Sequence, residues 1–71
     1  MPTFMVWARI VAKRENCYIT FEDANRQRRE FQVNSHDYAN YEVGDTGGLS
    51  YDERGSYMDF ALGEMPGRWK A

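Results

Sequence analysis

Cysteine and histidine are nearly missing from this sequence of 71 residues, which has one of each, Cys17 and His36. One cysteine excludes an internal disulfide, and one residue of each kind excludes a Cys/His zinc site within a single chain. A catalytic Cys–His pair would need the two side chains to converge, whereas we expect Cys17 to point inward and His36 to lie at the surface. A domain of this size also has no room for a pocket of the usual ~300 Å³ or more. We therefore expect no cofactor, no metal and no enzymatic activity.

Long apolar runs are missing as well. No window approaches the ~20 apolar residues of a bilayer-spanning helix, and the start Met1-Pro2-Thr3 lacks the basic region of a signal peptide. A lone cysteine is typical of proteins in a reducing compartment, so we expect a cytoplasmic protein that does not contact a membrane. The net charge of −2 argues against a surface devoted to neutralising phosphates. The charge is uneven, because residues 36–71 carry seven Asp or Glu against three Arg or Lys.

What the sequence has is short segments in which apolar and polar residues alternate, rich in β-branched and aromatic side chains. Such a two-residue period is typical of β-strands with one buried side. The expected strands are 3–13, 17–22, 27–33, 49–51 and 56–62. The alternation places five large side chains on the buried side: Ile10, Ile19, Phe21, Phe31 and Phe60. Aromatic residues make up 15% of the chain, which gives dense burial for so small a domain.

Turn residues separate these strands. Asn25 is expected to adopt left-handed backbone in the hairpin between the second and third strands, and Ser35 is expected to cap a single helical turn. In that turn Tyr38 and Tyr41 would form a lid over one end of the sheet. Five short strands at this spacing predict an all-β fold, a small, partly open barrel of the SH3-like or OB-like kind with one short helical turn. We expect one β-barrel domain over residues 1–63 and a C-terminal tail over residues 64–71.

Several of these strand and turn residues together resemble a family of small bacterial β domains of unknown function. The matching elements are 8–14 (ARIVAKR), 18–23 (YITFED), 29–33 (REFQV), Tyr38, 43–45 (VGD), Gly47, Leu49, Tyr51 and Phe60. The resemblance spans residues 8 to 60 and implies a fold but no catalytic residues. This chain differs from the family pattern in having Asn25 where a turn glycine is common, and in its extension after Leu62.

One outward-facing group of side chains is the candidate binding site. An aromatic and cationic band is expected on the first three strands, formed by Trp7, Arg9, Tyr18, Thr20 and Arg28, with Arg26 and Arg29 beside it. The candidate binding residues are Trp7, Arg9, Tyr18, Arg26, Arg28 and Arg29. Such a band anchors protein interfaces, where Trp, Tyr and Arg dominate the binding energy, or binds single-stranded nucleic acid by stacking and phosphate contacts. The alternative is a purely structural surface, with Trp7 covered by the C-terminal tail and the arginines paired with Glu22 and Glu30 across strands.

From these observations we expect a small, non-enzymatic protein-interaction or adaptor module that binds a protein partner or forms a homodimer. A single-stranded nucleic-acid-binding barrel is the second hypothesis. A small phage-type inhibitor that acts by protein binding is the third, suggested only by the acidic second half of the chain.

Overall fold

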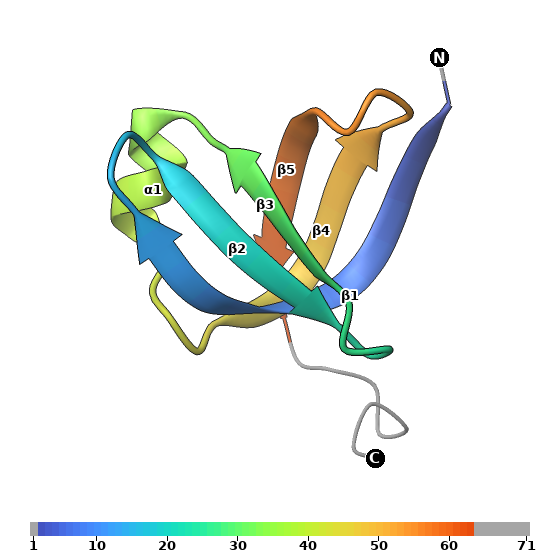
Figure 1. Cartoon of the computed structure of the whole chain (residues 1–71), viewed down its shortest axis with the longest axis horizontal. Helices are drawn as coiled ribbons and strands as arrows, with labels where there is room; N and C mark the ends of the chain where they lie inside the picture. Colours follow the sequence, from blue (N-terminus) through green and yellow to red (C-terminus); the bar gives the residue numbers. More distant parts are fainter. Residues whose placement is uncertain (1, 64–71) are drawn as a thin grey trace.

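The computed structural model describes residues 2–63, and they form five strands and one short helix (Figure 1). The elements are β1 Thr3–Arg14, β2 Tyr18–Asp23, β3 Arg28–Gln32, α1 Ser35–Asn40, β4 Thr46–Asp52 and β5 Tyr57–Leu62. All strands belong to one antiparallel sheet with the order β3-β2-β1-β4-β5. Within the described range β3 and β5 are the two edges, so the sheet curls without closing. The prediction of a small, partly open all-β barrel is confirmed; the predicted tail lies outside the described residues.

The long first strand joins the two halves of the sheet. Its residues Thr3 to Arg9 pair with β4, and its residues Ala8 to Arg14 pair with β2. The register with β2 shifts between Ile10 and Ala12, which is a β-bulge. Strict alternation along the expected strand 3–13 places Ala12 on the buried side with Ile10, and Lys13 outside, and this prediction is wrong. The extra residue reverses the alternation, so that Ala12 is exposed and Lys13 lies opposite the buried Ile19.

The core lies on the concave side of the curled sheet. All five side chains expected there are buried, together with three further residues; the buried apolar set is Ala8, Ile10, Ile19, Phe21, Phe31, Val33, Leu49 and Phe60. Phe21 is the centre of this set, with ring centroids 6.0 Å from Phe31 and 5.1 Å from Phe60. Burial of aromatic rings from both halves of the sheet therefore holds the halves together.

The helix α1 covers one end of the barrel through polar contacts. The Lys13 ammonium donates to the carbonyl oxygens of Tyr38 and Tyr41, at 2.6 and 2.7 Å. The Tyr41 hydroxyl donates to the Phe60 carbonyl oxygen on β5, and the Tyr57 hydroxyl donates to a carboxylate oxygen of Asp37. No residue of α1 itself is buried, so these hydrogen bonds, with the tyrosine rings, fix its position.

The cap of α1 differs from the prediction. The N-cap is Asn34, whose side-chain oxygen accepts from the Asp37 backbone N–H at 2.7 Å, while Ser35 is the first helical residue. Asn and Ser are nearly equivalent caps, and two adjacent candidates cannot be separated by propensity alone.

Two hairpin turns share one construction. In the β2–β3 turn, Asp23 Oδ1 accepts from the backbone N–H groups of Asn25 and Gln27. In the β4–β5 turn, Asp52 Oδ1 accepts in the same way from two backbone N–H groups, two and four residues later. In the β2–β3 turn the residue with left-handed backbone is Arg26, with φ 63°. The expectation that Asn25 is the left-handed residue was therefore wrong by one position.

Candidate functional site

The six candidate residues do not form one band. Trp7 and Arg9 lie on the outer face of β1, Tyr18 on the outer face of β2 and Arg28 on that of β3, as the cross-strand register requires. Arg29 is opposite the buried Phe21, so it belongs to the inner side of the edge strand β3. The sixth residue, Arg26, is exposed in the β2–β3 turn.

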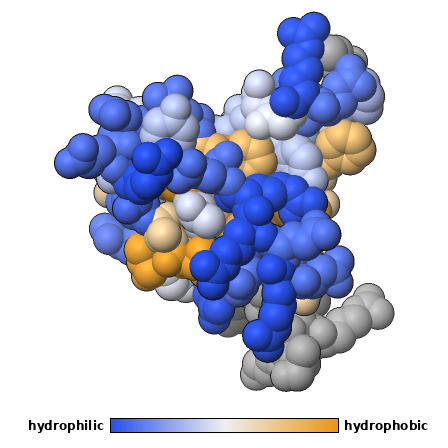
Figure 2. Space-filling model, viewed as in Figure 1, coloured by the Kyte–Doolittle hydropathy of each residue, from blue (hydrophilic) through white to orange (hydrophobic). Residues whose placement is uncertain are grey.

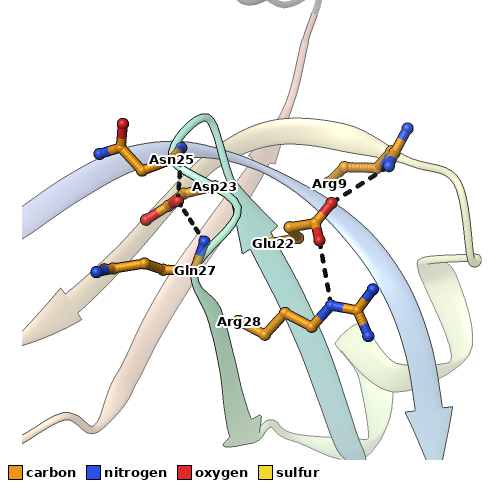
Figure 3. A network of polar contacts seen from close by, with 6 residues as sticks. All are labelled: Arg9, Glu22, Asp23, Asn25, Gln27 and Arg28. Carbon is orange, nitrogen blue, oxygen red and sulfur yellow. Dashed lines mark hydrogen bonds and ion pairs between the residues drawn. The ribbon is translucent and has the colours of Figure 1, made fainter.

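On the outer surface of β1, β2 and β3 the arginines are engaged by glutamates. We call this surface the arginine face, and its members are Arg9, Arg14, Tyr18, Glu22, Arg28 and Glu30. The carboxylate of Glu22 lies between two guanidinium groups, at 3.4 Å from Arg9 and 3.1 Å from Arg28 (Figure 3). The three side chains lie in one row across the strands because of the register, in which Arg9 opposes Glu22 and Glu22 opposes Arg28.

A second ion pair lies further along the same face. Arg14 makes a bidentate contact with Glu30, with nitrogen–oxygen distances of 2.8 and 2.9 Å, and its guanidinium carbon is 4.8 Å from the centre of the Tyr18 ring. The hydrogen bond from Arg14 holds the pKa of Glu30 below its ordinary value. Figure 2 shows that hydrophilic side chains cover most of the surface over β2 and β3. The arginine face is therefore polar, but its positive charges are largely compensated.

Arg29 serves the β2–β3 turn. Its guanidinium donates to Asp23 Oδ2 at 2.8 Å and to the side-chain oxygen of Gln27 at 3.0 Å. Desolvation at this buried position acts to raise the pKa of Asp23, but hydrogen bonds from Arg29 and from the backbone of Gln27 and Asn25 outweigh it and lower that pKa. Arg29 therefore has a structural partner that sequence alternation on β3 alone did not identify.

The other half of the outer surface, over β1, β4 and β5, has a different character. Its cross-strand rows are Met5–Ser50–Asp59 and Trp7–Gly48–Ala61. We call this surface the Met5–Trp7 face, defined by Met5, Trp7, Gly48, Ser50, Asp59 and Ala61. Met5 is 65% exposed. Sequence reasoning found Trp7 but missed Met5, because strand 49–51 as predicted was too short to show which residues lie beside β1.

Gly48 makes the Met5–Trp7 face flat. A Cβ atom on Gly48 would lie 3.5 Å from the Met5 sulfur, and a Cβ atom on Gly63 would lie 3.5 Å from the Trp7 ring. The side chain of Met5 therefore covers the glycine in the centre of the face, and the end of β5 lies against the indole. Trp and Met are enriched at protein interfaces, where Lys and Glu are depleted.

The described residues offer little for chemistry. Among residues 2–63 no group of three His, Cys, Asp or Glu side chains could hold a metal ion. Cys17 is half-buried against the core, and His36 Nε2 lies 3.0 Å from the Asn40 side-chain nitrogen on α1. No helix in the described part of the chain has the length and apolarity needed to cross a bilayer.

These features define a small all-β domain with two contrasting outer faces, one of paired charges and one with an exposed methionine beside an indole. Comparisons of the chain with protein-family models, with curated proteins and with solved structures gave no match.

Proposed function

We propose that this chain is a non-enzymatic protein-interaction module that binds its partner through the Met5–Trp7 face. The observation that carries the proposal is the contrast between the two outer faces. On the Met5–Trp7 face the side chain of Met5 is exposed, next to the Trp7 indole and over Gly48, which has no side chain of its own. On the arginine face, by contrast, the arginines already have carboxylate partners. Exposed apolar surface next to an aromatic anchor favours a protein ligand.

A cytoplasmic location belongs to this proposal, and it rests on the single, half-buried Cys17. Membership of the family of small bacterial β domains remains a hypothesis that rests on the strand and turn residues given above.

Single-stranded nucleic acid is the second candidate ligand, and the topology favours it. The strand order β3-β2-β1-β4-β5, with a helix between β3 and β4, supports an OB-like barrel over an SH3-like one. OB-like barrels bind oligonucleotides on the face of their second and third strands. In this chain that surface is the arginine face. A phosphate there would have to compete with Glu22 and Glu30, so we rank this candidate second.

Two variants with the same chemical change test the protein-binding proposal. Met5→Glu places a charge on the Met5–Trp7 face, and Val43→Glu places one on a loop, at a side chain that is 58% exposed. The immobilised full chain and both variants are exposed to an extract of the source cells, and retained proteins are identified and quantified. We expect a specific partner that the wild type and Val43→Glu retain and that Met5→Glu loses. Equal retention by all three would contradict the proposal.

The nucleic-acid candidate predicts a different result. Arg28→Glu would abolish a salt-sensitive shift of a single-stranded oligonucleotide, and Met5→Glu would leave that shift unchanged. Absence of any shift at ~50 mM salt would remove this candidate.

A further inference from the structure

We propose that the partner of the Met5–Trp7 face is a second copy of the same chain, arranged about a twofold axis. This inference rests on the proposed function, because it names the protein that the face binds. It is drawn from the position of two charged residues at opposite corners. Asp59 belongs to the Met5–Trp7 face, and Arg9, a member of the arginine face, borders it next to Trp7 on β1.

The register of three strands fixes these corners. Along β1 the outward residues are Met5, Trp7 and Arg9, and their neighbours on β4 are Ser50, Gly48 and Thr46. On β5, Asp59 opposes Ser50 and Ala61 opposes Gly48. Gly48 is in the middle row, between Trp7 and Ala61. Arg9 is on β1, in the next row toward one end of the strands, and Asp59 is on β5, in the next row toward the other end.

This diagonal arrangement is self-complementary. When two copies meet face to face about a twofold axis that lies in the face, perpendicular to the line from Arg9 to Asp59, each Arg9 lies opposite the partner copy's aspartate. The same operation places the apolar centre of one face on the apolar centre of the other. The strands of the two copies then cross at a large angle, as in orthogonal packing of sheets.

Asp59 can make this contact directly, and Arg9 can share its guanidinium donors between Glu22 and the partner copy's aspartate. Asp59 is exposed, and within residues 2–63 it has no hydrogen-bond or ion-pair partner through its side chain. The contact of Arg9 with Glu22, at 3.4 Å, is the longest of the four ion pairs in the described part of the chain, and 49% of the Arg9 side chain is exposed. A domain of 71 residues buries little core of its own, which is the situation in which association adds stability.

Charge reversal with rescue tests this inference. The mass of the full chain is measured by light scattering and sedimentation equilibrium over a range of concentrations, alongside Arg9→Asp, Asp59→Arg and the double variant. We expect the wild type to reach twice the monomer mass of 8.3 kDa. Each single variant should weaken dimerisation about tenfold or more, because like charges then face each other, and the double variant should restore it.

Matched controls separate this effect from a general effect of charge. Arg28→Asp removes the other arginine that contacts Glu22, and Glu15→Arg makes an acid-to-arginine change in the β1–β2 turn. Both should dimerise like the wild type. Circular dichroism and thermal melting confirm that every variant is folded.

The outcomes distinguish this inference from the proposed function. A chain that stays monomeric at all concentrations overturns the dimer, and the capture experiment with Met5→Glu still decides whether the face binds another protein. A dimer that both single reversals leave intact, or that the double variant does not restore, overturns the Arg9–Asp59 pairing.

Discussion

Arg26 and Gly55 occupy the same position in two turns of the same construction, and both have left-handed backbone, with φ 63° and 81°. Each follows an aspartate by three residues and donates its backbone N–H to that aspartate's carbonyl oxygen, at 2.9 Å in both turns. Left-handed backbone costs an L-residue roughly 1–2 kcal/mol, and glycine adopts it without a steric penalty. The β2–β3 turn therefore carries strain that the β4–β5 turn does not.

Replacing Arg26 with glycine should relieve that strain. We expect Arg26→Gly to raise the free energy of unfolding by about 0.5–1 kcal/mol, since the greater backbone entropy of glycine in the unfolded chain offsets part of the gain. Urea denaturation measures the change. Ala24→Gly, in the same turn but without positive φ, is the control and should be neutral or destabilising. A loss of stability in Arg26→Gly would contradict the turn geometry.

Adjacent glycines on β4 should respond in opposite ways to alanine. A Cβ atom on Gly47 would overlap the Ala61 carbonyl oxygen and lie 2.8 Å from its carbonyl carbon, whereas one on Gly48 would make ordinary contact with Met5. Because a backbone group cannot move aside without disrupting the β4–β5 pairing, Gly47→Ala should cost about 3 kcal/mol or more. Gly48→Ala should cost less than about 1 kcal/mol. Thermal melting of the two variants is the test, and equal melting temperatures would be incompatible with this register.

Acid should destabilise the domain partly through Asp23. Its pKa is lower in the folded state than in the unfolded chain, so the unfolded state binds the proton more readily. The ionised Asp23 carboxylate contributes its full stabilisation above its pKa in the unfolded chain, about 3.9. This stabilisation is lost as the pH falls through the lower pKa that Asp23 has in the folded state. In Asp23→Asn this contribution is absent. The variant should be less stable than the wild type at pH 7, and the difference should shrink below about pH 4. A pH-independent difference would contradict the assignment.

The anchoring of α1 by Lys13 gives a local prediction. Lys13→Met keeps the aliphatic chain but removes the charged donor to two carbonyl oxygens, a loss of about 1.5–3 kcal/mol for charge-assisted hydrogen bonds at a partly buried site. Backbone amides of the helix and its C-cap, such as those of Tyr38 and Tyr41, should exchange faster with deuterium. Arg14→Met removes an exposed ion pair instead and should leave the stability almost unchanged. Unchanged exchange in α1 would show that Lys13 does not hold the helix.

Truncation of the central aromatic rings should be the most damaging change. Phe21→Ala or Phe31→Ala should cost about 3–5 kcal/mol, a large part of the total stability of so small a domain. Both rings are buried, and Phe21 contacts rings from β3 and β5. A native melting curve in either variant would contradict the assignment of the core.

The strand-forming and core residues could be predicted from the sequence because alternation with a period of two is a local signal. It located Ile19, Phe21 and Phe31 correctly on the buried side. The bulge on β1 could not be predicted, since an extra residue changes only the pairing with another strand. Its consequence, the inward position of Lys13, was therefore missed.

The candidate site was harder to predict for a similar reason. Alternation showed that Trp7, Arg9, Tyr18 and Arg28 face outward, but only the strand order shows that Trp7 belongs with β4 and β5 while Arg28 belongs with β2. Long-range pairing thus divides one expected band into two faces.

The division of the outer surface into two faces is tested most directly by covalent labelling of exposed side chains in the free and the partner-bound chain, read by mass spectrometry. We expect Met5 and Trp7 to become protected on binding, while Tyr18 keeps the labelling of the free chain. Protection of Tyr18 with continued labelling of Met5 would contradict this expectation, and would assign binding to the arginine face.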